Sequence, residues 1–115
     1  MPLSATTALA REVIVPCPRD TPALTRAESE SLLAQIPKWT LSPDGTTLLR
    51  SCVLPDFAGA YALVERIAAL AEAADHHPDI AFGWGYVRLK LQTHSIGGLH
   101  RNDFIMAARI ETLPH

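Results

Sequence analysis

Histidine and carboxylate side chains are concentrated in one stretch of the chain, from Glu72 to Asp103, which holds four of the five histidines. Histidine can both donate and accept a proton near neutral pH because its ordinary pKa lies there. Two imidazoles from separate elements could face one substrate, one removing a proton while the other protonates a leaving hydroxyl group. We therefore predict acid–base chemistry in this stretch, with Glu72 and Asp103 orienting the histidines.

A metal site is not expected, although His76 and His77 are adjacent. Neighbouring side chains at a helix end diverge in direction, so this pair is not expected to share one ion. The sequence has no HExxH arrangement, and its two cysteines, Cys17 and Cys52, have no CxxC spacing. We interpret the cysteines as structural or incidental thiols, and we expect neither a metal nor a bound cofactor.

Length and composition indicate one domain, since the chain has 115 residues, of which 48% are hydrophobic and 19% charged. The net charge is -2 with acidic and basic residues interspersed, so no basic face is expected to hold nucleic acid. No segment approaches the roughly 18 apolar residues of a membrane helix, and the N-terminus lacks the apolar run of a signal peptide. These observations predict no membrane partner and a cytoplasmic location.

Residues 1–20 are interpreted as an N-terminal extension, because they hold three prolines and show no sustained periodicity. Within them, residues 13–15 could form a short strand or pack on a neighbouring element. The domain is expected to cover residues 21–115. It begins with the capping box Thr25-Arg26-Ala27-Glu28, which opens a helix that Pro37 ends. An Asp44-Gly45 pair between two β-prone runs then predicts a hairpin.

Asp56 is a suitable N-cap for a longer helix, in which apolar residues recur at helical spacing as far as Ala71. Pro78 disfavours helical geometry at the residue before it, so this helix should end near residue 75 or 76. A second hairpin is expected to turn at Gly85, and its residues 86–94 alternate between two faces. A last helix should open at residue 102 or 103, with a buried stripe ending at Leu113.

The expected order is therefore helix, hairpin, helix, hairpin, helix. Hairpins interrupted by helices predict an α+β fold, with a four-stranded antiparallel sheet and helices packed on one of its faces. Trp84 is the least settled aromatic residue, because it could lie in the core or offer a flat face on which a heterocycle stacks. We favour the core.

The residues of the Glu72–Asp103 stretch resemble those of the pterin-4a-carbinolamine dehydratases, and the similarity extends over about residues 25–111. It includes Trp39, the Asp44-Gly45 turn and the helix start at Asp56. Its most specific part is the following set: Glu72, three residues, His76-His77-Pro78, an aromatic at Trp84, His94 after nine intervening residues, and Asp103.

The resemblance implies a lyase of tetrahydrobiopterin metabolism that dehydrates 4a-hydroxytetrahydropterin to quinonoid dihydropterin and water, without a metal or cofactor. It implies this site: catalytic His76, His94 and Glu72, with substrate-binding His77, Pro78, Trp84 and Asp103. Which catalytic histidine takes which proton is left open. Family members commonly assemble as dimers and tetramers, so a pterin substrate and a homodimer or homotetramer are expected.

The sequence departs from the common family pattern at Trp84-Gly85-Tyr86, Ser95 and His100. The hairpin change is expected to reshape the pocket rim and weaken pterin binding, and His100 replaces the usual Ser or Thr N-cap of the last helix. Such divergence leaves an alternative of another class, a non-catalytic relative that serves as a RuBisCO assembly factor in carboxysome-containing bacteria. We favour the enzyme because the histidines and Asp103 are retained.

Overall fold

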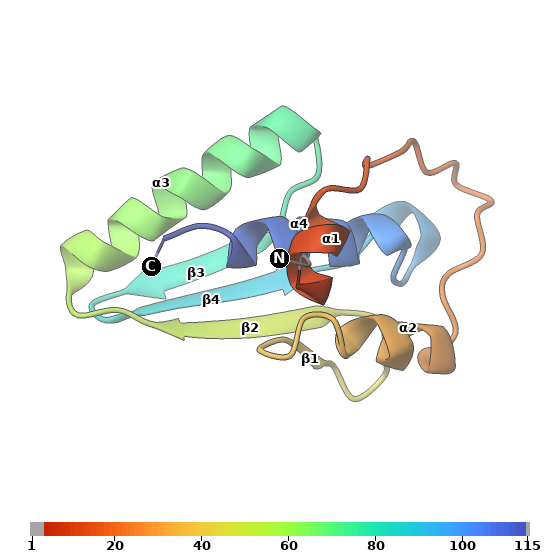
Figure 1. Ribbon diagram of the computed structural model, residues 1–115, viewed down its shortest axis with the longest axis horizontal. Coiled ribbons are helices and arrows are strands. Elements are labelled where there is room, and N and C mark those ends of the chain that lie inside the picture. Colours follow the sequence, from red (N-terminus) through yellow and green to blue (C-terminus); the bar gives the residue numbers. More distant parts are fainter. Residues whose placement is uncertain (1–3, 115) are drawn as a thin grey trace.

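Four antiparallel strands form one sheet in the order β1-β2-β4-β3, so the second strand of each hairpin lies at its centre (Figure 1). The computed structural model describes residues 4–114, so parts of the predicted 1–20 extension and 21–115 domain, residues 1–3 and 115, lie outside it. The elements are α1 (Ala5–Ala10), α2 (Arg26–Leu33), β1 (Thr40–Leu41), β2 (Leu48–Val53), α3 (Phe57–Ala74), β3 (Asp79–Gly83), β4 (Tyr86–Leu91), the 3-10 helix η1 (His94–Ile96) and α4 (Arg101–Glu111). The predicted α+β class is confirmed, and after residue 20 the elements follow the predicted order.

One face of the sheet is buried and the other faces solvent. In β4, Val87, Leu89 and Leu91 are buried, whereas the residues between them are exposed. This is the alternation predicted from the sequence, and it follows from the two-residue period of a strand. Helix α3 packs against β3 and β4, and α4 packs against α3. No helix in residues 4–114 is long and apolar enough to cross a membrane.

The predicted start and stop signals are found where the sequence places them. Thr25 and Glu28 form the capping box, with Glu28 N donating to Thr25 Oγ1 at 3.1 Å and Thr25 N to Glu28 Oε1 at 2.9 Å. Asp56 caps α3 by accepting from Gly59 N at 2.7 Å. Helix α3 ends at Ala74, and the chain leaves it through Asp75 in the left-handed conformation at φ 50°. The last turn of α3 thus delivers His76 to the sheet edge.

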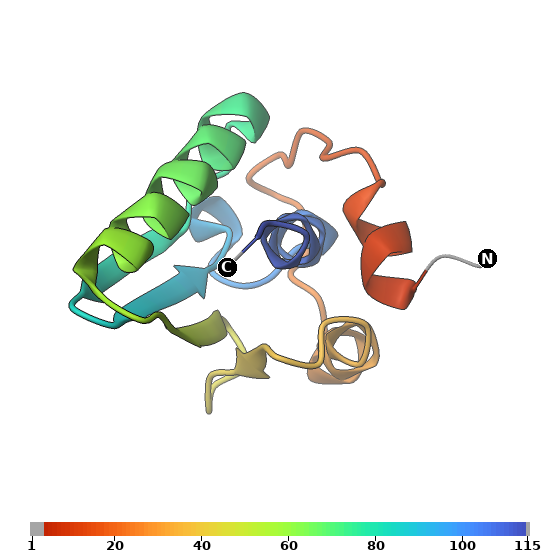
Figure 2. The ribbon, with the colours of Figure 1, turned by 60° about the vertical axis from the view of Figure 1, so that its left-hand side comes forward.

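Helix α4 is more central than its sequence suggests. A single buried stripe is predicted, but residues 102–108 and Ile110 are all buried. Figure 2 shows α4 nearly end-on, with α1, α2, α3 and the sheet around it. Helix α1, which the sequence does not predict, covers one side of α4 and buries Leu9 there. A six-residue helix is too short to be stable alone, so its formation depends on this packing.

Candidate active site

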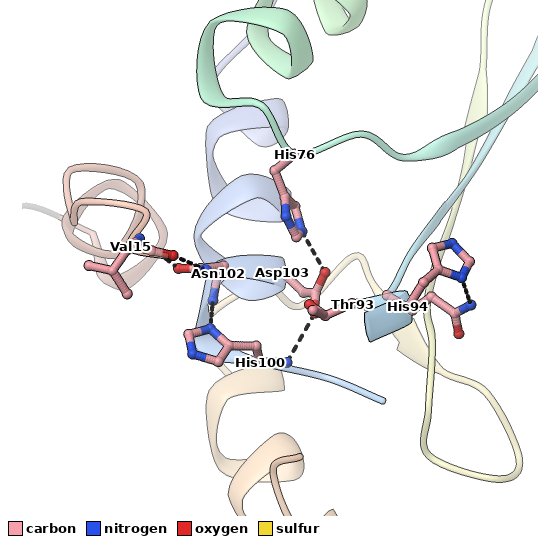
Figure 3. Close-up of polar contacts among 8 residues, drawn as sticks. Val15, His76, Thr93, His94, His100, Asn102 and Asp103 are labelled. Carbon is pink, nitrogen blue, oxygen red and sulfur yellow. Dashed lines mark hydrogen bonds and ion pairs between the residues drawn. The ribbon is translucent and has the colours of Figure 1, made fainter. Parts of the chain in front are cut away.

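The site is built where the end of α3, the segment after β4 and the first turn of α4 meet (Figure 3). Asp103, in the first turn of α4, is its centre and is completely buried, with 0% exposure. Its Oδ1 lies 2.7 Å from Nε2 of His76, and its Oδ2 accepts from Thr93 Oγ1 at 2.7 Å and from the backbone N of His100 at 3.0 Å. Three partners from separate segments therefore fix this carboxylate.

The contact with Asp103 fixes the tautomer of His76. An ionised carboxylate only accepts hydrogen bonds, so Nε2 of His76 must carry the hydrogen between them. The other ring nitrogen, Nδ1, makes no hydrogen bond within residues 4–114. The side chain of His76 remains 14% exposed. His76 is thus held in one orientation, with a proton-accepting nitrogen available to a ligand.

His94 belongs to η1 and is exposed. Its Nδ1 lies 2.8 Å from Nε2 of Gln92, and Oε1 of Gln92 accepts from Thr47 Oγ1 at 3.1 Å. Because the amide nitrogen of Gln92 can only donate, Nδ1 of His94 accepts, and in the neutral ring Nε2 carries the hydrogen. Thr93, the residue before His94, donates to Asp103. The carboxylate that contacts His76 therefore also holds the segment that carries His94.

Glu72 lies beside His77 rather than beside His76 or His94. Its Oε2 is 3.6 Å from His77 Nε2, and both side chains are largely exposed. An exposed ion pair of this kind contributes at most about 1 kcal/mol. Pro78 follows His77 directly before β3. Of the two acids predicted to orient histidines, Asp103 contacts His76 and Glu72 contacts His77.

Trp84 lies apart from this site. It is 72% exposed, so the favoured interpretation of a core residue is wrong. Trp84 stands at the turn between β3 and β4, whereas His76 precedes the opposite end of β3, and the strand spans about 13 Å at about 3.3 Å per residue. Within one chain the turn of this hairpin lies at the end of the sheet away from His76 (Figure 1). A substrate-binding role for Trp84 stays a prediction.

His100 caps α4, although it replaces the usual Ser or Thr at this position. Its Nδ1 accepts from Asn102 N at 3.0 Å, while its backbone N donates to Asp103. An imidazole nitrogen therefore replaces the hydroxyl of a Ser or Thr cap, because either atom can accept from the first turn.

A cavity of about 420 Å³ opens beside His76, within the size range of small-molecule sites. It is lined by Ala74, Asp75, His76, Thr93, Asn102 and residues 14–17. Of the predicted site residues, His77, Pro78 and His94 do not line this cavity. Asn102 and residues 14–17 are not among the site residues predicted from the sequence. Thr93 could have been predicted as a site residue, because it lies on the inward-facing side of the strand directly before His94. In residues 4–114, no cluster of three His, Cys, Asp or Glu side chains could hold a metal ion.

Comparison with known proteins identifies the family. The family model described as pterin 4 alpha carbinolamine dehydratase matches residues 22–113. The chain belongs to the pterin-4a-carbinolamine dehydratase family. This confirms the resemblance seen in the sequence. Within the family's matched range lie all the histidines of the site and Asp103.

Relatives and a solved structure agree with this assignment. Proteins provisionally named pterin-4-alpha-carbinolamine dehydratases come from Aromatoleum aromaticum, 51% identical over 85% of this chain and 88% of that protein, and from Halorhodospira halophila, 41% identical over 91% and 96%. A crystal structure titled transcriptional coactivator/pterin dehydratase, from Brucella melitensis, has a TM-score of 0.73 at 29% identity, covering 77% of this chain and 95% of that one. The pterin dehydratase family therefore agrees with this chain in both sequence and fold.

Proposed function

We propose that this protein dehydrates 4a-hydroxytetrahydropterin to quinonoid dihydropterin and water by acid–base catalysis with His76 and His94. The observation that carries the proposal is the buried Asp103, which holds His76 through Nε2 and leaves Nδ1 free to act on a ligand. A buried carboxylate that orients an imidazole in this way also stabilises the imidazolium formed when the ring takes a proton. Membership of the family supplies the substrate class.

The reaction requires one base and one acid. The N5–H proton leaves, a C4a=N5 double bond forms, and the C4a–O bond breaks as the hydroxyl departs with a second proton as water. In this division of roles, Nδ1 of His76 accepts the N5 proton, and His94 acts as an imidazolium that donates from Nε2 to the hydroxyl. In that form the Gln92 amide turns so that its oxygen accepts from Nδ1 of His94. Since the base ends protonated and the acid ends deprotonated, solvent exchange restores both rings after each turnover.

The remaining predicted residues have supporting roles in this proposal. Asp103 positions His76, and through Thr93 it also fixes the backbone before His94. His77 and Pro78 directly follow His76 in the chain and would contact the substrate, and Glu72 would set the orientation of His77. A homodimer or homotetramer stays a prediction.

The direct test is a coupled assay in which an aromatic amino acid hydroxylase generates the 4a-carbinolamine. We expect the folded protein to accelerate quinonoid dihydropterin formation above the spontaneous rate. Heat-denatured protein at the same concentration is the control. A rate no better than buffer, from protein shown to be folded by circular dichroism, would contradict the proposal and favour the non-catalytic alternative, whose binding to RuBisCO could then be measured directly.

Dehydration is expected to proceed without a metal. The reason is that an acid and a base suffice for the elimination, and the two adjacent histidines have different partners, Asp103 and Glu72. Dialysis against a chelator should leave the coupled rate unchanged. Stoichiometric zinc or iron in elemental analysis, with activity lost on chelation and restored on adding the ion, would refute this prediction.

A further inference from the structure

Residues 12–17, here called the strap, run from α1 across the first turn of α4 to the His76 cavity. We infer that the strap is a specificity wall of the active site, which contacts the substituent at C6 of the pterin, and that Asn102 is the residue that positions it. The inference rests on the proposed function. It goes beyond the family's common part, because the family model begins at residue 22 and the strap lies before it.

The strap is fastened to α4 at several points. Asn102 acts like a short piece of β-strand: its Oδ1 accepts from Val15 N at 3.1 Å and its Nδ2 donates to Val15 O at 2.7 Å. Arg101 makes two bonds of 2.7 Å to the Glu12 carboxylate, and Arg109 donates to the backbone O of Glu12 at 2.8 Å. These contacts hold the strap against the helix that carries Asp103.

Asn102 and Asp103 connect the strap to the catalytic centre. They are consecutive in the first turn of α4 and project to different sides, Asn102 to Val15 and Asp103 to His76 (Figure 3). Both are buried. The position of the strap relative to His76 is therefore set by two adjoining side chains of one helical turn.

The cavity lining has two parts of different chemistry. The strap contributes Ile14, Val15, Pro16 and Cys17, which are largely apolar, whereas the rest of the lining includes His76, Asp75 and Thr93. In the proposed reaction His76 acts at N5, and C6 is bonded to N5. Among the parts of the substrate that vary between pterins, the C6 substituent is thus the nearest to the reacting atom. The apolar residues of the strap are the surface that we infer it contacts.

Val15 offers a test that leaves the fastening in place, because Asn102 bonds its backbone and not its side chain. Val15 is 48% exposed, so side-chain changes should affect stability little. The measurement compares kcat/KM for two substrates, one with a dihydroxypropyl and one with a methyl substituent at C6. We expect Val15→Ala and Val15→Phe to shift the ratio of these two values in opposite directions. Each shift should be up to about tenfold, in line with one or two methylene-sized contacts, and should appear mainly in KM.

Val13 supplies the matched control. It lies on the same strap two residues away, is 75% exposed and is not part of the cavity wall. Val13→Ala and Val13→Phe should leave the substrate ratio unchanged. Asn102→Ala should bring the ratio of the two kcat/KM values closer to one. Arg26→Ala removes a side-chain hydrogen bond to the backbone O of Pro43 in another loop, and it should leave this ratio unchanged.

Cys17 gives a second readout that does not depend on catalysis. It is half-buried in the cavity wall, so a bound, unreactive 7,8-dihydropterin should slow its alkylation by iodoacetamide in intact-mass measurements. Cys52 is the internal control, since burial raises the pKa of its thiol and keeps the reactive thiolate scarce.

Identical substrate ratios in wild type and both Val15 variants, or unchanged Cys17 alkylation at saturating ligand, would overturn the role of the strap while leaving an active wild type. A wild-type rate no better than buffer would instead overturn the proposed function, and this inference with it.

Discussion

Replacing His76 with glutamine is expected to lower kcat by about 10²-fold or more, the range found when a general acid or base is removed. Glutamine can still donate from its amide nitrogen to Asp103, so the buried carboxylate keeps a partner while the titrating ring is lost. The coupled hydroxylase assay measures the effect. His94→Gln is expected to give a loss of similar size, because the other proton transfer is then removed.

His100→Asn is the control for removal of an imidazole. Asparagine is a good N-cap, so it can replace the contact of His100 with Asn102 N and leave the backbone bond to Asp103 in place. Activity in this variant should stay close to that of the wild type. Wild-type rates in both His76→Gln and His94→Gln would remove these residues from the mechanism, whatever the behaviour of His100→Asn.

Asp103→Asn is expected to reduce kcat by about 10²- to 10⁴-fold, the upper figure being that of the corresponding Asp→Asn change in the Ser-His-Asp triad. Thr93 and the backbone N of His100 both donate to Oδ2, so the amide oxygen of asparagine would face them and its NH₂ group would face His76. Nε2 of His76 would then have to accept, which places the hydrogen on Nδ1 and removes the base.

Two measurements separate this positioning role from a loss of folding. Asp103→Asn should keep the circular dichroism spectrum of the wild type while kcat falls, since the amide can still fill the three hydrogen-bonding positions of the carboxylate. Asp103→Ala should in addition lower the free energy of unfolding by about 3 kcal/mol or more in urea titrations. The reason is that the three groups that donate to this fully buried carboxylate would lose their acceptor. A folded Asp103→Asn protein with the wild-type rate would show that Asp103 does not position the base.

Local signals account for most of what could be predicted. The Thr25–Glu28 capping box, the Asp56 cap and the alternation of β4 depend on residues within a few positions of one another, so they can be read along the chain. The same holds for the end of α3, where Pro78 and the left-handed Asp75 act on their neighbours. The motif from Glu72 to Asp103 also identified the family, because its residue types and spacings are specific.

The sequence by itself thus determined the fold class and the family, and it predicted the residues to which we assign the chemistry. Only the tertiary structure decided how these residues meet: that Asp103 holds His76, that Glu72 lies beside His77, and that Trp84 stands at the far end of β3. It also decided that the strap reaches the site, through a bond between Val15 and Asn102, which are 87 residues apart. Such contacts leave no periodic or capping pattern, because they depend on the path of the whole chain and on burial of α4 between elements distant in sequence.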